Sequence, residues 1–288
     1  MIATIHIDGR DWRCDLSAGL SIAIPLRFGG PQPNSYDVPA ASSTAYEGNG
    51  FVGDTRRGGS CNFESLTLIP HCNGTHTECV GHIALDRIAV TEVLAPALLP
   101  ATLVSVATPE AAGTGERYEP VPAESDRFIT AAGLRDALDA LGITAPGEGD
   151  LPDGPVHPFL EALCIRTLPN SEEKTARRYI KHPAPFFSIE AMRLVRALGV
   201  RHLLVDVPSL DRAFDEGMMC AHHIFWDVSE GGHDVDASQP SPRSVTEMIY
   251  VPDALPDGRW LLDIQIAPFV SDAAPSRPVL FPITEIRT

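Results

Sequence analysis

Three histidines and a glutamate lie within twelve residues of the chain, between His71 and His82. His76 and Glu78 are two positions apart, so in an extended segment their side chains point to the same side. His71 stands five positions before His76 and can meet it only if the chain bends, which Gly74 allows. Imidazole nitrogen and carboxylate oxygen together form the ligand mixture that zinc, manganese and iron prefer. The segment therefore predicts a site for a divalent metal ion.

Other interpretations of these residues are open. A single histidine in a loop is usually just hydrogen-bonded there, but the clustering beside a strand end favours the metal site. Cys72 and Cys79 could also ligate as thiolates, although their spacing matches no zinc-finger pattern. As small buried hydrophobic residues they need no function.

Further polar residues stand downstream in apolar surroundings. Asp206 and Asp211 frame the end of a predicted strand, and the histidine pair His222 and His223 follows eleven residues after the second acid. A histidine that enters an apolar segment is usually a satisfied core residue. Glu247 lies in a mostly apolar strand, where a carboxylate is costly to bury unless it is paired or metal-bound. The alternative for Glu247 is an edge position that faces water.

The remaining pattern predicts the elements that must position these residues. Strands are expected within residues 3–16 (two, around a turn at 8–9) and over 66–70, 162–167, 200–206, 245–251 and 260–269. Helices are expected over 128–141, closed by Gly142, and from an N-cap at Ser188 to 198, closed by Gly199. Loops are expected over 28–60, 108–125 and 144–158. The strand–helix–strand order favours one α/β domain over 1–288, with a mixed, partly parallel sheet or barrel-like core and peripheral helices.

Composition narrows the partners and the compartment. The 288 residues carry 22 basic and 38 acidic side chains, a net charge of −16 that repels phosphate backbones and anionic lipid surfaces. We therefore expect a small-molecule substrate, with neither nucleic acid nor a membrane as partner. No run of about 18 apolar residues exists, and the N-terminus has no apolar signal-peptide core. Six cysteines without a C-x-x-C pair agree with a reduced compartment, so a cytoplasmic location is expected.

The motifs together resemble those of a known family. Gly74-Thr75-His76-Thr77-Glu78 with His82 is similar to the hallmark of the metal-dependent cyclase/hydrolase family that includes the bacterial kynurenine formamidases. That hallmark is a histidine, then Gly-Thr-His-x-Asp, then a histidine four positions after the Asp. The family's later elements look like Asp206, Ser209 and Asp211, then His222, then Glu247 with the stretch from Leu255 to Pro268. The resemblance spans about residues 15–285, and residues 199–211 are especially similar.

The resemblance implies one or two divalent ions, usually zinc or manganese, and a homodimer or homotetramer. Carried over by position, it implies a first ion held by His71, His76 and Glu78. It implies a second ion held by Glu78, His222 and Glu247, with Glu78 bridging the two. His82 would be the general acid/base, a role that suits a side chain titrating near neutral pH.

The chemistry implied is hydrolysis. An ion in such a site lowers the pKa of bound water from about 15.7 toward about 7, which supplies hydroxide to attack an amide or ester carbonyl. By the resemblance, the substrate is an N-formyl arylamine such as N-formylkynurenine, an intermediate of tryptophan catabolism, and the products are formate and the free amine. A cyclic amide or lactone is the near alternative. An aromatic pocket could draw on Phe63, Phe225, Trp226 or Phe269, but a core position is the favoured interpretation for each.

Two readings from other classes stay open. An iron oxygenase would use two histidines and one carboxylate, for which His71, His76 and Glu247 are available. The second alternative is a metal-binding protein that has lost catalysis. It is considered because the chain departs from the family pattern at two places. Four residues separate His71 from His76 where the family has three, and the bridging Asp is here Glu78, one methylene longer. We expect the longer loop and the longer carboxylate to compensate each other.

Overall fold

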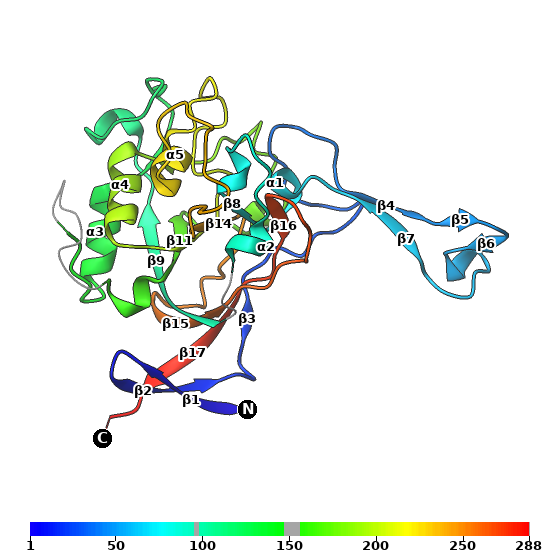
Figure 1. The fold of residues 1–288 in the computed structure, drawn as a ribbon, viewed down its shortest axis with the longest axis horizontal. Helices are drawn as coiled ribbons and strands as arrows, with labels where there is room; N and C mark the ends of the chain where they lie inside the picture. The colour runs from blue at the N-terminus through cyan, green and yellow to red at the C-terminus, as the bar shows by residue number, and fades with distance from the viewer. Residues whose placement is uncertain (95–97, 147–155, 288) are drawn as a thin grey trace.

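A large mixed β-sheet with helices against it forms the body of the protein (Figure 1). The computed structural model describes residues 1–94, 98–146 and 156–287. Its strands are β1 (Ile2–Ile7), β2 (Arg10–Asp15), β3 (Leu20–Ser21), β4 (Ser42–Ala45), β5 (Glu47–Gly48), β6 (Phe51–Val52), β7 (Glu64–Thr67), β8 (His76–Cys79), β9 (Leu98–Ala107), β10 (Phe128–Ile129), β11 (Ala162–Leu168), β12 (Phe186–Phe187), β13 (His202–Val205), β14 (Ser244–Glu247), β15 (Gly258–Asp263), β16 (Ala273–Pro275) and β17 (Val279–Glu285). Its α-helices are α1 (Pro70–Asn73), α2 (Val90–Val93), α3 (Ala131–Asp139), α4 (Ile189–Ala197) and α5 (Cys220–Trp226). Its 3-10 helices are η1 (Thr55–Arg57), η2 (Val80–His82), η3 (Ala111–Gly113), η4 (Pro158–Leu160) and η5 (Glu172–Ala176).

The main sheet has eleven strands and combines parallel with antiparallel pairing. β9, β11, β13 and β14 run parallel at its centre, and β8 joins β14 antiparallel. On the other side of β9, the strands β15, β17 and β2 continue the sheet antiparallel. A bridge between Ala23 and Ile249 joins the segment after β3 to the segment after β14, so the sheet curls toward a barrel-like form. The expected mixed α/β fold is confirmed.

The central strands are buried on both faces. Leu103 and Leu204 lie in a core built from strands and their connections, whereas their neighbours Val104 and Leu203 lie in a second core that includes residues of α3, α4 and α5. Burial on both faces explains why these strands read as nearly continuous apolar runs. No helix in the described ranges is both long and apolar enough to cross a bilayer.

Local signals fixed several element ends as predicted. The Ser188 hydroxyl accepts a hydrogen bond from the Ala191 backbone N–H at 2.9 Å and caps α4, and the chain leaves this helix at Gly199 with a φ of +76°. The unit β11–α4–β13 is parallel, as expected. The helix predicted over 128–141 begins later, because residues 128–129 pair with β12 as strand β10. The strand predicted over 245–251 ends at Glu247, because Met248 adopts a left-handed conformation with a φ of +52°.

The other predicted boundaries also shift. The two N-terminal strands form around a turn at residues 8–9, and the region 108–125 contains only η3. The strand expected over 66–70 is β7, which ends at Thr67 before α1 begins. The strand expected over 260–269 ends at Asp263. Residues 147–155 of the loop expected over 144–158 lie outside the described ranges.

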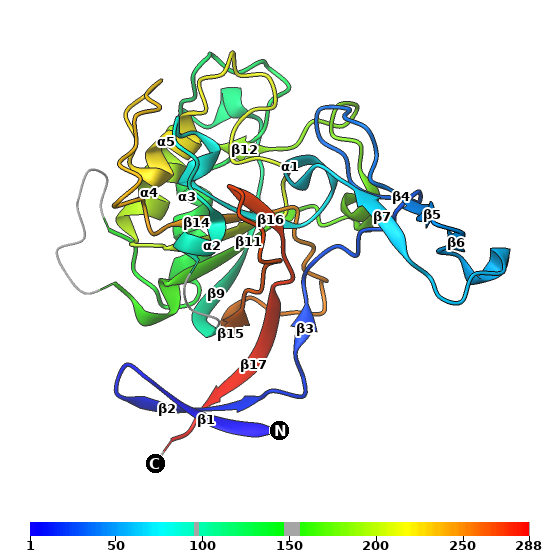
Figure 2. The ribbon, with the colours of Figure 1, turned by 45° about the vertical axis from the view of Figure 1, so that its right-hand side comes forward.

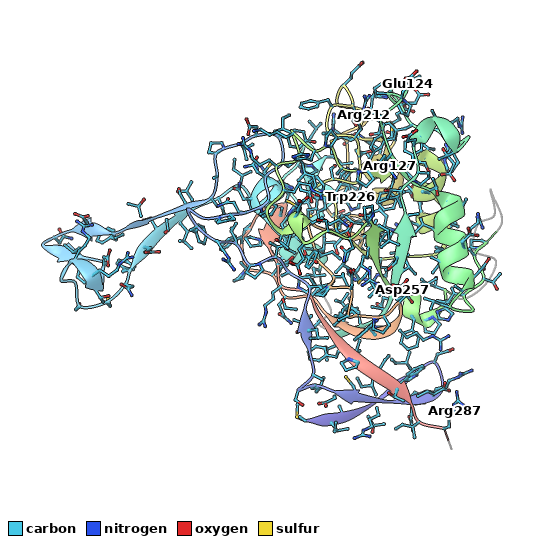
Figure 3. The ribbon with its side chains drawn as sticks, turned by 180° about the vertical axis from the view of Figure 1, so that it is seen from behind. Glu124, Arg127, Arg212, Trp226, Asp257 and Arg287 are labelled. Atoms are coloured by element: carbon cyan, nitrogen blue, oxygen red, sulfur yellow. The ribbon has the colours of Figure 1, made fainter. Side chains whose placement is uncertain are left out.

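The predicted loop over 28–60 is wrong in part, because much of it belongs to an arm that leaves the body (Figures 1 and 2). We call residues 42–67 the arm. β4 and β7 form its antiparallel stalk, and the β5–β6 hairpin with η1 forms its tip. Seen from behind, side chains stand out on both sides of the stalk with no other segment against them (Figure 3). At the tip, the Phe63 ring contacts Tyr46 and Phe51, with ring centroids 5.2 and 6.1 Å apart.

Candidate functional site

Neighbouring strands β8 and β14 provide the centre of the site, with α1 and β16 beside them (Figure 1). His76 and Glu78 occupy alternate positions of β8, as their spacing predicts, and Glu247 of β14 lies directly opposite His76. The Thr75 hydroxyl accepts a hydrogen bond from the Ile24 backbone N–H at 2.8 Å and donates one to the carbonyl of Met248 at 2.5 Å. This hydroxyl therefore ties the start of β8 to the turn that follows Glu247.

His71 reaches the same place from the short helix α1. Its Nδ1 lies 2.8 Å from Oε2 of Glu78. The bend between His71 and His76 comes from the helical turn itself, which the Asn73 side chain closes by accepting a hydrogen bond from the Ile69 backbone N–H at 2.7 Å. Gly74 is extended, with a φ of 170°. The expectation that glycine flexibility provides this bend is therefore wrong.

His222 enters the site from the first turn of α5, where Asp211 holds it. The Asp211 carboxylate accepts hydrogen bonds from the backbone N–H groups of Ala221 at 2.6 Å and His222 at 3.1 Å, and it lies 2.5 Å from His222 Nδ1. The Tyr118 hydroxyl donates to the same carboxylate at 2.8 Å. The far nitrogen of His222, Nε2, lies 3.1 Å from Oε1 of Glu78.

The five residues form two overlapping groups whose ligand atoms lie within 4.8 Å of one another. The first group is His71, His76 and Glu78, and the second is Glu78, His222 and Glu247. Glu78 belongs to both, since Oε2 faces His71 and Oε1 faces His222. The structure thus brings together all five residues that the resemblance marks as ligands. The set His71, His76 and Glu247, required for the oxygenase alternative, is not among the groups found in the described residues.

These residues fit a divalent cation. Nε2 of His76 is buried without a hydrogen-bond partner, and within the second group Nε2 of His222 lies 3.1 Å from Oε1 of Glu78 and 3.7 Å from Oε1 of Glu247. Two ligands bound tetrahedrally to one ion at about 2.0–2.2 Å are roughly 3.3 Å apart, so these spacings suit ligand atoms around an ion. The other nitrogen of His76, Nδ1, lies 2.9 Å from the Gly74 carbonyl. An acceptor behind each ligating imidazole is typical of metal sites, and here each histidine has one.

The buried carboxylates of the site attract positive charge, which favours cation binding as well. Burial opposes the charged form of His71, but hydrogen bonds to Asp272 and Glu78 outweigh it and raise the pKa of His71 to about 10. Burial also opposes charging of His222, yet Asp211, Glu247 and Glu78 raise its pKa well above the ordinary value. Burial alone would raise the pKa of Glu78, but the neighbouring histidines hold it well below its usual range. Protons on imidazoles therefore balance the buried carboxylates in the metal-free chain.

His82, expected to act as acid/base, lies in η2 beside both groups. Its ring is 4.3 Å from that of His71 and 5.7 Å from that of His222, measured between centroids. The Trp226 ring, labelled in the middle of the body in Figure 3, lies 5.1 Å from the His222 ring, so this core residue packs against His222. The His82 side chain is 28% exposed, so it can meet both the site and solvent.

Asp272 is a residue of the site that the sequence did not reveal. Its Oδ2 lies 2.8 Å from Nε2 of His71 and 3.5 Å from Nδ1 of His82, and these three residues form a third group of ligand-type atoms. Asp272 stands 201 residues after His71. It belongs to no short motif, and only the pairing of the β16 region with β8 brings it here.

Several other singled-out residues lie elsewhere. Asp206 is buried against Lys174, with Oδ2 and Nζ 2.8 Å apart, and it also accepts hydrogen bonds from Thr167. Asp206 therefore takes part in a buried ion pair with Lys174 and is not a member of the metal-ligand groups. Cys72 and Cys79 are buried, and no ligand-type group in the described part of the chain includes a cysteine. His223 is also buried and lies outside these groups.

Four aromatic residues were candidates for a substrate pocket, with a core position favoured for each. The structure confirms the core position for two of them. Phe225 and Trp226 are buried in the core, as favoured. Phe63 and Phe269 are 54% and 51% exposed, so the core interpretation is wrong for them. Phe63 is on the arm, and Phe269 precedes Asp272 in the chain.

The chain belongs to the family described as "Putative cyclase", which residues 14–212 match. No curated protein matches it. Among solved structures, an isatin hydrolase bound to the product analogue thioisatinate is similar with a TM-score of 0.57 and 12% identity, over 93% of this chain and 94% of that one. Isatin hydrolase A from Labrenzia aggregata, bound to benzyl benzoate, has a TM-score of 0.55 and 15% identity, over 91% and 93%. A predicted metal-dependent hydrolase from Bacillus stearothermophilus has a TM-score of 0.51 and 16% identity, over 91% and 97%. At these identities the likeness shows a shared fold.

Metal binding is expected to weaken as the pH falls. The raised pKa values of His71 and His222 keep both imidazoles protonated at neutral pH in the metal-free chain, and an ion must displace those protons. Each displaced proton makes the apparent affinity change about tenfold per pH unit. Competition with a chelator between about pH 6 and pH 8 measures the zinc Kd directly. A Kd independent of pH would contradict this assignment of ligands.

Proposed function

We propose that this protein is a metal-dependent hydrolase that cleaves the C–N bond of an amide, with an N-formyl arylamine such as N-formylkynurenine as substrate. The observation that carries the proposal is the pair of ligand groups sharing Glu78, with the His82 ring beside both. Membership of the cyclase family and the likeness to chains described as hydrolases support it. Zinc or manganese is the proposed ion, since both accept imidazole and carboxylate ligands.

The reaction divides between the ion and the side chains around it. A divalent cation in this site lowers the pKa of a water molecule toward about 7 and polarises a carbonyl oxygen. His82 accepts a proton from the attacking water and returns it to the departing nitrogen as the C–N bond breaks. Water and the N-formyl amine are thereby converted to formate and the free amine. Glu78 and Glu247 would hold the ion through their carboxylate oxygens, and the neighbouring histidines keep the pKa of Glu78 well below its usual range.

A cyclic amide or lactone is the second candidate substrate. Two of the similar structures are described as isatin hydrolases, and isatin is a cyclic amide fused to an aromatic ring. Tyr36 and Phe214, 46% and 65% exposed, contact edge to face with ring centroids 6.1 Å apart. Partial burial and then the charge of Glu247 raise the pKa of Tyr36 to about 12, which agrees with a place beside the site. Such rings suit a planar aromatic substrate of either kind.

Protein purified without chelator or affinity metal is expected to contain one or two equivalents of zinc or manganese per chain. His76→Ala removes a buried ligand nitrogen that has no hydrogen-bond partner, so it should lose the metal. Elemental mass spectrometry measures both. A panel of N-formyl arylamines, cyclic amides and lactones then identifies the substrate from the product formed. If the metal-loaded protein turns over none of these compounds, the protein binds metal without catalysing their hydrolysis, and the hydrolase proposal fails. Turnover of cyclic amides alone would overturn the formamidase assignment.

His82→Asn is expected to retain the metal and to lose about 10²–10⁴-fold in kcat, the usual contribution of a general acid/base. An asparagine can still hydrogen-bond to Asp272 but cannot carry the proton. The control His182→Asn changes an exposed histidine and should leave kcat unchanged. Normal kcat in His82→Asn would remove His82 from the mechanism.

We also propose that the chain works as a homodimer that its arm helps to form. Every residue of β7 is exposed, and Phe63 and Leu66 are each 54% exposed. A two-stranded ribbon is marginally stable in water by itself, so we expect the arm to be supported by contact with another chain. Twofold dimers are the commonest homo-oligomers, so a second copy is the proposed partner of the arm.

Sedimentation equilibrium is expected to give twice the chain mass for the wild type. The double variant Phe63→Ser, Leu66→Ser removes the apolar surface of the arm and should shift the protein toward the monomer. The matched control Phe269→Ser, Leu85→Ser changes residues that are 51% and 78% exposed outside the arm and should leave the dimer intact. A monomeric wild type, or an arm variant as dimeric as the control, would refute the role of the arm.

A further inference from the structure

Asp272 is placed to act on two histidines with a single oxygen atom. Oδ2 is 2.8 Å from Nε2 of His71 and 3.5 Å from Nδ1 of His82. The two imidazole rings stack at 4.3 Å between centroids with a tilt of 30°, so the carboxylate meets both at one edge of the stack. His71 and His76 each need a free nitrogen toward the ion. For His71 that nitrogen is Nδ1, which faces Glu78.

The backbone around Asp272 fixes the carboxylate at this place. The Asp272 carbonyl accepts a hydrogen bond from the Cys79 N–H at 3.1 Å, and the Ser271 carbonyl accepts one from Val90 at 2.8 Å. The Ser271 hydroxyl donates to Oδ1 at 3.2 Å, which leaves Oδ2 for the histidines. The residue therefore extends from a segment pinned to the end of β8, the strand of His76 and Glu78.

Gly81 makes this approach sterically possible. A Cβ at position 81 would lie 2.2 Å from the Ile88 carbonyl oxygen and 3.2 Å from Cβ of Asp272. A side chain there would collide first with the Ile88 carbonyl, and it would also press on the Asp272 side chain. The glycine before His82 is therefore required mainly by Ile88, and it also gives Asp272 room to approach η2.

A carboxylate that accepts from one ring nitrogen decides which nitrogen carries the hydrogen. With Nε2–H of His71 bonded to Asp272, the lone pair of His71 is on Nδ1, toward Glu78. Nδ1 of His82 lies 3.5 Å from the same oxygen, and a hydrogen on Nδ1 toward that carboxylate would leave the lone pair of His82 on Nε2, where it can accept a proton. We propose that Asp272 is a positioning residue that sets the tautomer and ring orientation of both a metal ligand and the acid/base. This inference rests on the proposed function only for the role of His82.

Asp272→Asn tests the proposal with little risk to folding, because the side chain is 23% exposed and the substitution keeps its size. Removing such a carboxylate behind a ligating histidine typically weakens metal binding by about 10–100-fold, which chelator competition with zinc measures. At saturating zinc, kcat is expected to fall at least about tenfold, with KM changed by less than about twofold. Asp272→Glu, which keeps the charge, should bind zinc more tightly than Asp272→Asn.

Nitrogen NMR of ¹⁵N-histidine-labelled, zinc-loaded protein gives a readout that a merely structural role would not move. Wild type should show His82 with its hydrogen on Nδ1, and Asp272→Asn should show a mixture of tautomers. The control Asp263→Asn changes a carboxylate on β15 that bonds to Gln265. It should match wild type in zinc Kd, kcat and NMR signals. Zinc affinity within about twofold of wild type, together with unchanged His82 signals, would overturn the inference. These two measurements decide the role of Asp272 even if the wild type hydrolyses none of the substrates offered.

Discussion

The burial of Glu78 is the constraint around which the site is organised. Its side chain is 1% exposed, and an isolated carboxylate in such a place costs several kcal/mol even after relaxation, by the general estimate for buried ions. The surroundings must therefore supply positive charge to each of its oxygens. They do so with His71 at Oε2 and His222 at Oε1, and a divalent cation can take over from the protons of both. Because either protons on the two histidines or a bound cation can balance the charge of Glu78, the site can exchange protons for a metal ion.

The fold meets this constraint by using rigid elements from distant parts of the chain. β8 lies between β14 and β16 and pairs with both, so Glu78 and His76 cannot shift without breaking backbone hydrogen bonds. Asp211 accepts hydrogen bonds from backbone N–H groups in the first turn of α5 and is also the acceptor behind His222. Such double use means that the orientation of a ligand is fixed by the same bonds that form the secondary structure. Strand β7 of the arm ends at Thr67 and α1 begins at Pro70, so the position of His71 is also linked to the exposed stalk of the arm.

How far the sequence predicts this arrangement depends on whether the signal is local. The alternation of His76 and Glu78, the Ser188 cap and the Asp8–Gly9 turn are local, and the structure has all three. The family resemblance extended the prediction to His222 and Glu247, which no spacing connects with β8. Asp272 was missed because its role arises only when β16 pairs with β8. The arm was missed because glycine- and proline-rich sequence looks like a loop unless its strand pairing is known.

The two departures from the family pattern have a physical resolution in the same geometry. The connection from His71 to His76 begins with the helical turn α1, where each residue adds about 1.5 Å of length rather than the roughly 3.3 Å of an extended chain. A short helix therefore absorbs an insertion with a small change in reach but a large rotation of the side chain. A rotated imidazole needs a partner that holds it in its new direction and a ligand that reaches toward it. Asp272 provides the first at 2.8 Å, and the extra methylene of Glu78 provides the second, also at 2.8 Å. The 2.8 Å distance from Glu78 to His71 supports our hypothesis that the longer carboxylate and the longer connection compensate each other, and reverting Glu78 to the family's aspartate alone is expected to withdraw its oxygen from His71.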